Sequence, residues 1–404
     1  MKILLLTKKF PYPLREGEPI AITYLSRSLA AAGCEITLLA MNTTKHFFNL
    51  AALPPEYNHF KAIHTVTVDN RITPGGALKS LLAGEAYILS RFVSKAYEEK
   101  LAEILLAEHF DVVQLETLYL AHYIPVIRRH SNAIIAMRAH NVEHEIWQRL
   151  AANSPFFLKK WYLLNQNQHL RRFEISRLND YDLMVAITQR DLEVFRKLGY
   201  RKATVVAPVG IDLKDYEPDF QCFEKNPSLA FIGALDWMPN QEGIVWFLEN
   251  VWQEISSRYP QLEFHVAGKN TPAWLRRQAQ KNVHFHGEVP DAVAFLNAHP
   301  ILIAPLFSGS GIKIKVLEGM SLGRVVLTTP VGVEGIPARH GEHFLLGEAA
   351  EDFVQNLTFC LENQSEMKPL GIRARRFIQT EFDNLAIANK LIEAFKKLIV
   401  NAWS

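Results

Sequence analysis

The sequence predicts an α/β protein built from two Rossmann-like domains, each with a parallel β-sheet. Short apolar runs alternate with longer segments of helical periodicity along the whole chain, and this alternation is typical of βαβ units. Most runs are continuously apolar, as expected for strands that are buried on both faces of a sheet. The length of 404 residues exceeds the roughly 100–200 residues of one domain, so we expect two.

The predicted strands fall into two series. The first series comprises 3–6, 36–39, 66–68, 112–115, 134–137 and 183–187. The second series comprises 229–232, 264–267, 283–285, 301–303 and 325–327. A polar, proline-containing stretch from Asp212 to Ser228 separates them and is predicted to link a first domain, residues 1–212, to a second, residues 228–381. The last helical pattern, within residues 382–404, has apolar residues at three-to-four spacing and needs a surface to pack on.

Composition and charge narrow the class of protein. The chain has 49% hydrophobic residues and a formal net charge of +2, which predicts a folded protein without the basic field of a nucleic-acid-binding protein. Its three cysteines are far apart and predict neither a disulfide framework nor a zinc set. Lys8 and Lys9 end the first apolar run early, which favours a first strand over a signal peptide. The few cysteines fit a reducing compartment, so we expect a cytoplasmic protein. No uncharged apolar run approaches the ~18 residues of a membrane span, so we expect it to be soluble or at most peripheral to a membrane.

A glycine-rich turn in the second half is the strongest functional signal. Gly309, Ser310 and Gly311 follow a predicted strand and precede a helical pattern, and such a turn exposes backbone N–H groups where anions bind. Lys313 and Lys315 add positive charge beside the turn. Together they predict a clamp for the diphosphate of a nucleotide. The alternative is a tight structural loop followed by a solvated helix face.

The segment around this turn carries an ordered series of motifs. They are Gly-Ser-Gly at 309–311, Lys-X-Lys at 313–315, Leu-Glu-Gly-Met at 317–320, Gly-Arg-Val-Val at 323–326, Thr-Thr at 328–329 and Gly-X-Glu-Gly at 332–335. This order resembles the donor half of GT-B glycosyltransferases related to family 4, over most of residues 228–345. In that family two glutamates bracket seven residues. Glu318 matches the second, which binds ribose, whereas Ser310 stands in the place of the first and leaves the sugar pocket without that carboxylate.

Further matches to the family follow other strands of the second half. Gly233 and Lys269 come after its first two strands, and the resemblance places both near the diphosphate, with a structural glycine and an ordinary surface lysine as the alternatives. Gly287 and Val289 resemble the turn whose backbone holds the nucleobase. Where the family often has a basic residue after its first donor-domain strand, this chain has Asp236, so the lysines beside the glycine turn and Lys269 must meet the diphosphate charge.

In the first half, His140 is the predicted catalytic residue. It lies in the segment Arg138-Ala139-His140 after a predicted strand and resembles the acceptor-side histidine that the family carries at this strand end; a structural histidine is the alternative. Asn141 and Glu143 are predicted to line the same site. His140 and His144 have an i, i+4 spacing, but the zincin pattern His-Glu-X-X-His is absent, so we predict no metal. Gly17 stands where the family places a glycine turn near donor and acceptor.

The resemblance implies a retaining, metal-independent sugar transfer without a cofactor or an identified covalent nucleophile. The donor would be a UDP- or GDP-linked sugar, and the acceptor a glycan, a lipid-linked glycan or a small molecule. The resemblance also implies a cleft between two domains that close by a hinge, and a C-terminal helix that crosses back to the first domain. Basic and apolar residues mix in 158–172 and near Lys79, Arg91 and Lys95, as in interfacial helices. This pattern predicts peripheral contact with the inner face of a membrane, with a solvated helix face as the alternative.

Two other functions stay open at this point. A nucleotide-sugar epimerase on the same architecture would isomerise a nucleotide sugar without an acceptor. A non-catalytic nucleotide-sugar-binding protein would bind the donor and transfer nothing. A two-lobed periplasmic ligand-binding protein is disfavoured by the nucleotide clamp and by the start of the chain, which does not have the pattern of a signal peptide.

Overall fold

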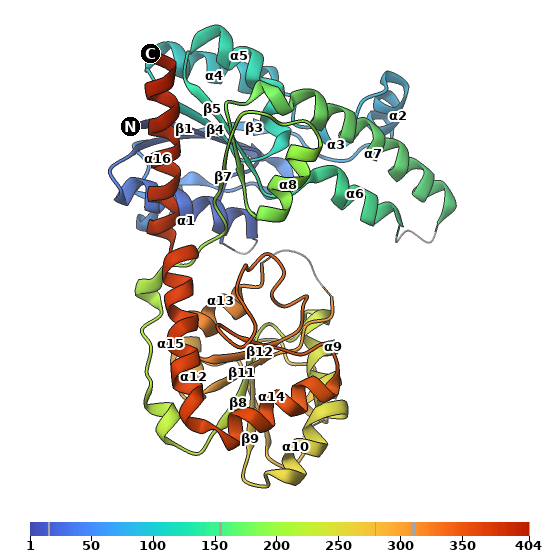
Figure 1. Cartoon of the computed structure of the whole chain (residues 1–404). Helices are drawn as coiled ribbons and strands as arrows, with labels where there is room; N and C mark the ends of the chain where they lie inside the picture. The colour runs from blue at the N-terminus through green and yellow to red at the C-terminus, as the bar shows by residue number, and fades with distance from the viewer. Residues whose placement is uncertain (15–16, 153–155, 279, 309–311, 404) are drawn as a thin grey trace. The chain divides into compact units, whose positions relative to one another are not determined.

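The computed structural model describes residues 1–14, 17–152, 156–278, 280–308 and 312–403. They form two compact units, Met1–Gly210 with Ile387–Ser404 and Ile211–Ala386. Each unit has a parallel sheet with helices packed on it (Figure 1). The predicted α/β class is confirmed.

The sheet of the first unit has the strand order β3-β2-β1-β4-β5-β6-β7 in the described residues. Its strands are β1 (Lys2–Thr7), β2 (Glu35–Thr43), β3 (Ala62–Val68), β4 (Val112–Leu115), β5 (Ile134–Ala139), β6 (Leu183–Ala186) and β7 (Ala203–Val206). All neighbouring pairs are parallel, with Ile3 opposite Ile36 on one side and Val112 on the other. The strand order reverses beside β1, which places the topological switch point between β1 and β4.

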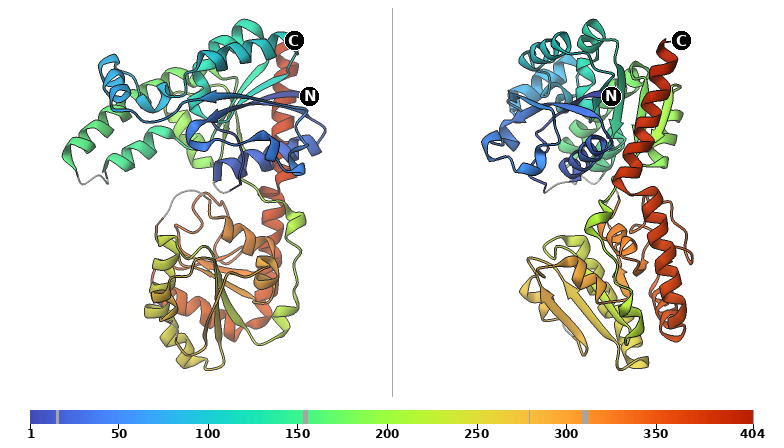
Figure 2. Two further views of the ribbon diagram at one scale, coloured as in Figure 1. Left: turned by 180° about the vertical axis from the view of Figure 1, so that it is seen from behind. Right: turned by 90° about the vertical axis from the view of Figure 1, so that its left-hand side faces the viewer.

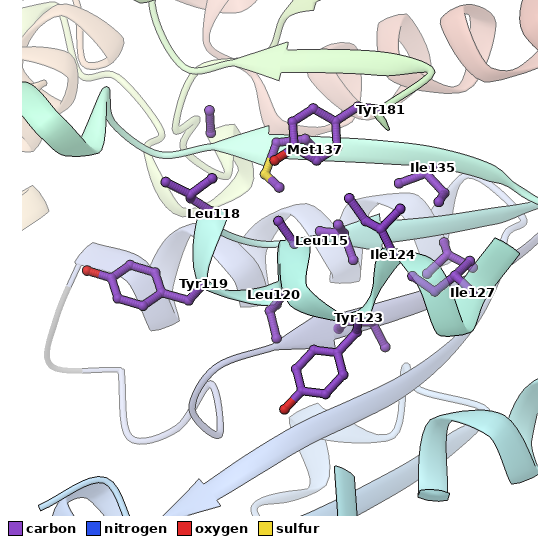
Figure 3. Packing of buried hydrophobic residues seen from close by; sticks show 14 of the residues in the cluster. Leu115, Leu118, Tyr119, Leu120, Tyr123, Ile124, Ile127, Ile135, Met137 and Tyr181 are labelled. Carbon is purple, nitrogen blue, oxygen red and sulfur yellow. The ribbon is translucent and has the colours of Figure 1, made fainter. Parts of the chain in front are cut away.

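The apolar runs of this sheet are continuous because both of its faces are buried. Alternate residues of β1 belong to different cores: Leu4 and Leu6 lie in one cluster, and Ile3 and Leu5 lie in the other. The first cluster continues into the residues after β4, where Leu118, Tyr119, Leu120 and Tyr123 fill the space under the helices (Figure 3). A charged residue in such a strand therefore needs a specific partner.

Helices cover the first sheet and connect its strands. They are α1 (Gly17–Ala31), α2 (Pro74–Ala83), α3 (Tyr87–Ser90), α4 (Lys95–Ala107), α5 (Ile124–His130), α6 (Glu143–Ala152), α7 (Phe157–Arg177) and α8 (Gln189–Lys197). A 3₁₀ segment, Leu118–Tyr123, joins β4 to α5. Helices α6 and α7 lie side by side and extend beyond the sheet of this unit (Figure 1).

The sheet of the second unit has the order β10-β9-β8-β11-β12-β13 in the described residues. Its strands are β8 (Ser228–Ile232), β9 (Glu263–Ala267), β10 (Val283–Gly287), β11 (Ile301–Ala304), β12 (Val325–Thr328) and β13 (Leu345–Leu346). Its helices are α9 (Met238–Phe247), α10 (Gln253–Arg258), α11 (Ala273–Arg276), α12 (Ala292–Asn297), α13 (Ile314–Ser321), α14 (Ala350–Glu362) and α15 (Gln364–Glu381), with a π-helical segment, Leu248–Trp252, between α9 and α10. The order reverses beside β8, so this sheet has its own switch point.

Each predicted apolar run forms a strand, but β7 and β13 were not predicted. β7 lies at the edge of its sheet, and only Val205 of its four residues is buried. β13 has only two residues. Such short edge strands need little apolar surface, so they leave a weak sequence signal.

The segment from Asp212 to Ser228, expected as a linker, packs on the second unit. Cys222 and Phe223 are buried in its core. The buried guanidinium of Arg324 donates to the backbone carbonyl of Asp219 across 2.8 Å. The polar segment is therefore part of the second unit, held there by two buried side chains and by a hydrogen bond to its backbone.

The last helix, α16 (Asn384–Trp403), packs on the sheet of the first unit (Figure 2). Its apolar residues at helical spacing, among them Ile387, Leu391 and Phe395, are buried in the same cluster as Ile3 and Leu5. The sheet of the first unit is therefore the surface on which the apolar stripe of α16 packs. None of the described helices is both long and apolar enough to span a membrane.

Candidate active site

The predicted donor residues of the second unit follow strands beside its switch point. Gly233 directly follows β8, and Lys269 lies two residues after β9. The segment after β11 leads to α13. Ligands of doubly wound sheets bind outside the carboxyl ends of the strands at such a point, so these residues stand where a donor site is expected.

Gly233 and Gly268 have no room for a side chain, Gly268 because of the backbone of Gly233 and Gly233 because of the side chain of Lys315. A Cβ atom on Gly268 would lie 1.9 Å from the carbonyl oxygen of Gly233, and one on Gly233 would lie 2.6 Å from Nζ of Lys315. The N–H of Gly233 donates to the carbonyl of Ala267 at 3.1 Å, and that of Gly268 to Gly287 at 2.7 Å. The glycines therefore let the ends of β8, β9 and β10 meet with bare backbone.

Lys315 is a buried cation in the first turn of α13. Its ammonium donates to Oδ1 of Asn240 at 2.6 Å and lies 4.3 Å from the centroid of the Phe231 ring. Burial lowers the pKa of Lys315 to about 7, and the charge of Glu318 only partly opposes that effect. An anion placed beside this amine would favour its charged form.

Lys313 and Glu318 flank Lys315 on the same helix. Lys313 is the N-cap of α13 and is only 6% exposed; burial lowers its pKa, and Glu334, 3.9 Å away, opposes the shift. Glu318 accepts a hydrogen bond from the hydroxyl of Tyr216 at 2.8 Å. Burial raises the pKa of Glu318, against the effects of Tyr216 and Lys315. Two amines at the N-terminus of α13 and one carboxylate in its middle are thus held in fixed positions.

The glycine turn itself, Gly309, Ser310 and Gly311, lies outside the described residues. The strand end before it is tied to β12, because the hydroxyl of Thr329 donates to the carbonyl oxygen of Leu306. The position of this end relative to the sheet is therefore fixed by a buried hydrogen bond.

The remaining predicted donor residues lie on the neighbouring loops. Lys269 is exposed after β9. Gly287 ends β10 with a φ of 70°, a left-handed conformation that favours glycine, and Val289 is half-buried in the loop to α12. Asp236 accepts a hydrogen bond from the amide of Asn270 at 2.7 Å. Asp236, which Asn270 holds by a hydrogen bond, thus stands where the family often has a basic residue.

In the first unit, His140 is paired with a carboxylate from the adjacent strand. His140 directly follows β5, and Glu116 directly follows β4, which is parallel to β5. Nε2 of His140 lies 2.8 Å from Oε2 of Glu116. The guanidinium of Arg138, which is 1% exposed, donates to the same oxygen at 3.2 Å. Arg138 and His140 at the end of β5 therefore form one group with Glu116 at the end of β4.

This group fixes the tautomer of His140. Burial disfavours the charged form of Glu116, but the charge of Arg138 and the hydrogen bonds from His140 and Gln114 outweigh it, so the pKa of Glu116 is lowered. An ionised carboxylate only accepts hydrogen bonds, so Nε2 of His140 carries the proton. Nδ1 of the neutral ring then has a free lone pair with which it can accept a hydrogen bond.

Glu143, the first residue of α6, is a buried carboxyl group close to this histidine. Burial raises the pKa of Glu143 to about 7; the charge of Lys8 opposes that shift, whereas those of Glu174 and Glu18 add to it. The hydroxyl of Tyr119 donates to Oε2 of Glu143 at 3.3 Å. This carboxyl group is therefore close to half-protonated at neutral pH.

His144 does not share a carboxylate with His140. Its Nδ1 lies 2.5 Å from Oε2 of Glu174, whereas His140 is paired with Glu116. Glu174 also accepts a hydrogen bond from the N–H of Glu143 at 3.1 Å. The two histidines thus belong to separate pairs, and His144 and Glu174 tie the start of α6 to α7.

A small cavity of about 10 Å³, enough for one water molecule, lies next to His140. Asn141 and Glu143 line it, together with apolar residues from the core. Figure 3 shows two of these, Met137 and Tyr181, close together. The predicted neighbours of His140 are therefore brought together around it.

Gly17 starts α1 in the loop after β1. The next residue, Glu18, lies 3.4 Å from Nζ of Lys8 and 3.7 Å from Nζ of Lys9. The ammonium of Lys8 also lies 4.1 Å from the centroid of the Tyr119 ring. This loop therefore places two amines at the switch point of the first sheet.

With this geometry in place, residues 226–363 match the family model described as "Glycosyl transferases group 1". The match lies within the second unit, Ile211–Ala386. It confirms the family resemblance inferred from the motifs and supports a glycosyltransferase of the group 1 type.

Solved structures agree on the fold of this glycosyltransferase. Sucrose-phosphate synthase from Thermosynechococcus elongatus is 16% identical, with a TM-score of 0.65 over 99% of this chain and 100% of that one. Anabaena HepE in complex with UDP is 15% identical, with a TM-score of 0.66 over 98% and 100%. A Klebsiella pneumoniae protein described as "Uncharacterized 44.6 kDa protein in cps region" is 22% identical over 411 residues, 97% of this chain and 99% of that protein. The predicted GT-B fold is confirmed.

Three residues of the glycosyltransferase sites were missed from the sequence. Glu116 directly follows the predicted strand 112–115; a position after a predicted strand also drew attention to His140, so Glu116 could have been found. Tyr216 lies 102 residues before Glu318, inside the stretch expected as a linker. Asn240, the partner of Lys315, lies in α9 and has no local signal.

Proposed function

We propose that this glycosyltransferase is a retaining, metal-independent hexosyltransferase that takes a sugar from a UDP- or GDP-linked donor and requires no cofactor. The main support for this proposal is the buried ammonium of Lys315, which lies beside Gly233. Lys313 is the N-cap beside it, at a helix N-terminus where the dipole favours anions. These groups suit the diphosphate of a nucleotide sugar.

Between the two nucleotides, we favour uridine diphosphate. HepE, whose fold this chain shares, has been crystallised with UDP and with UDP-glucose. In this chain Glu318 would accept hydrogen bonds from the ribose hydroxyls, and backbone groups at Gly287 and Val289 would meet the base. Lys269 would add a second, exposed charge near the phosphates.

The transfer step needs the charge of the departing diphosphate to be neutralised. Lys313 and Lys315 would do so electrostatically from fixed positions, together with N–H groups of the glycine turn. A leaving phosphate oxygen on the same face of the sugar would take the proton of the acceptor hydroxyl, which gives retention of configuration. No protein nucleophile is then required.

In the first unit, His140 would orient the acceptor. Its Nε2–H is held by Glu116, so Nδ1 would accept a hydrogen bond from an acceptor hydroxyl. Asn141 and Glu143 line the neighbouring cavity and, with Gly17 at the start of α1, would complete this surface. The acceptor would be a glycan or a lipid-linked glycan.

An arm of the first unit supports a lipid-linked acceptor. Helices α6 and α7 extend beyond the sheet (Figure 2) and carry exposed apolar side chains, namely Ile146, Leu150, Phe156, Phe157, Leu158, Trp161 and Leu164. Phe157 is 79% and Trp161 53% exposed, and Lys159 and Lys160 lie between them. Aromatic residues beside lysines are typical of interfacial helices on anionic membranes. We therefore place the protein in the cytoplasm, in peripheral contact with the inner face of the membrane.

Donor binding is tested by a thermal-shift series with UDP, GDP and ADP. A ligand at ~100 times its dissociation constant adds ~2.7 kcal/mol to the stability of the native state, so a rise in Tm with UDP alone is expected. Incubation with radiolabelled UDP-sugars and a panel of lipid-linked acceptors then tests transfer. Isomerisation of the donor without an acceptor would indicate an epimerase, and binding without transfer would indicate a binding protein.

Membrane contact is tested by sedimentation with vesicles. Binding to vesicles with anionic lipid is expected, with weaker binding to purely zwitterionic ones. The double variant Phe157→Ser/Trp161→Ser should lose this binding, whereas Val93→Ser/Leu106→Ser, at exposed apolar residues of the same unit, should keep it. Equal binding of both variants would overturn the membrane role of the arm.

A further inference from the structure

Three histidines of the second unit and one glutamate lie on one face of its sheet. His265 of β9 lies opposite His284 of β10 in the parallel register. Glu263 lies two residues before His265, and His286 two residues after His284, so all four are placed on the same face by the period of a strand. No local metal-binding motif marks them in the sequence, because two different strands contribute the donor atoms.

The distances within this group match those between ligands of one ion. Oε2 of Glu263 lies 3.3 Å from Nε2 of His265, and Oε1 lies 3.6 Å from Nε2 of His284. All three ligand atoms lie within 4.8 Å of one another. Ligands at about 2.0–2.1 Å from a tetrahedral ion are separated by roughly 3.3 Å, so small side-chain rotations bring these atoms into range.

We propose that Glu263, His265 and His284 bind one divalent transition-metal ion, with zinc as the best match. Two imidazoles and one carboxylate suit Zn²⁺, Co²⁺ and Ni²⁺, whereas Mg²⁺ and Ca²⁺ prefer sites built from oxygen. Water would fill the remaining coordination position, because Glu263 and His284 are 52% and 45% exposed.

His286 and His299 both contact His265 and hold its ring in place. Nδ1 of His265 lies 2.9 Å from Nε2 of His286. When Nε2 of His265 binds the ion, Nδ1 carries the proton and donates to His286, an outer-shell hydrogen bond of the kind that orients metal-binding histidines. The ring of His299 stacks on His265 with a centroid distance of 4.3 Å, and its Nδ1 lies 2.7 Å from the hydroxyl of Ser228. His265 is thus held in one orientation.

The ion would join an edge strand to the rest of its sheet. β10 is at the edge of the sheet and pairs only with β9 in the described residues, and it ends at Gly287. A link between His284 and His265 would resist the separation of β10 from β9. The proposal concerns stability and does not depend on donor binding or on transfer.

The test is titration of the full chain, without a polyhistidine tag, with Zn²⁺ by calorimetry and with Co²⁺ by visible absorption. One equivalent of each should bind, and bound Co²⁺ should give an intense tetrahedral spectrum. His284→Ala and Glu263→Gln should each weaken binding at least 100-fold. His286→Gln, which alters only the outer shell, should weaken it about 10–100-fold.

His46→Ala is the matched control, since His46 is an exposed histidine of the first unit, and it should bind the ion like the unaltered chain. Because Glu263 and His284 are half exposed, their variants should fold, and circular dichroism checks that they do. Unchanged affinity in both His284→Ala and Glu263→Gln, or no binding of either ion to the unaltered chain, would overturn the proposal.

Discussion

The ammonium of Lys315 donates to the side-chain oxygen of Asn240 across 2.6 Å, and this partner is neutral. A buried amine whose hydrogen-bond partner is neutral loses part of its tendency to ionise, which agrees with the lowering of the pKa of Lys315 to about 7, a shift that Glu318 only partly opposes. The donor site therefore contains a group whose charge depends on whether an anion is bound. Four predictions follow from this and from related pairs of residues.

UDP binding should be coupled to proton uptake by Lys315. The diphosphate raises the pKa of the amine above about 7, so at pH 8 the free protein must take up a proton to bind. Affinity should fall as pH rises above 7, by up to about tenfold per unit. Calorimetry at pH 8 in buffers of different ionisation enthalpy measures this uptake. Lys315→Met should bind UDP about 100-fold more weakly and take up fewer protons on binding. An equal proton uptake in that variant would disprove the coupling.

Glu318→Gln should weaken binding of UDP but not of inorganic pyrophosphate. The amide keeps the shape and still accepts the hydrogen bond of Tyr216, but it is a weaker acceptor for ribose hydroxyls than a carboxylate. Since hydrogen bonds to charged groups contribute about 1.5–3 kcal/mol, the dissociation constant for UDP should rise about 10–100-fold. Lys315→Met is the contrasting variant and should weaken both ligands. If Glu318→Gln weakens both equally, Glu318 acts on the diphosphate instead.

Glu116→Gln should destabilise the first unit, because it leaves the buried guanidinium of Arg138 without its counter-charge. The expected loss is about 3–5 kcal/mol, measured by denaturant unfolding. The pKa of Glu116 is lowered from 4.5, so its stabilisation is present above pH 4.5 and is lost as pH falls through the lower, folded value. The variant should accordingly lose less stability than the unaltered chain on acidification below pH 4.5. His140→Ala should instead reduce kcat/KM about 10–100-fold, with a smaller loss of stability than Glu116→Gln because Arg138 still pairs with Glu116.

Gly268→Ala should destabilise the second unit without removing any charge. The new Cβ would lie 1.9 Å from the carbonyl oxygen of Gly233, and the backbone cannot move away without breaking the hydrogen bond to Gly287. Overpacking of this kind costs about 1–3 kcal/mol, read from the midpoint of chemical unfolding. Gly75→Ala, in α2 with open space around the new atom, should be neutral or slightly stabilising. Equal stability of the two variants would contradict the close approach.

Much of the secondary structure could be predicted from the sequence because it is set by local periodicity. Runs such as 134–137 and 301–303 are apolar at every position, as burial on both faces demands, and each forms a strand. The order of motifs after residue 309 was sufficient to identify the donor half. His140 could be singled out because a polar residue directly after a buried strand must lie at the edge of the sheet.

The pairing of these residues was decided only by the tertiary structure. Glu116 meets His140 because β4 and β5 are neighbours in the sheet, and Tyr216 meets Glu318 because a polar segment packs on the second unit instead of linking the two. The facing of His265 and His284 depends on the register of β9 and β10. The sequence by itself determined which residues end strands and start helices, because those features follow from local periodicity and turn chemistry. Which of them touch, and hence which pKa values shift, depends on strand order and register, which are set by packing over the whole unit.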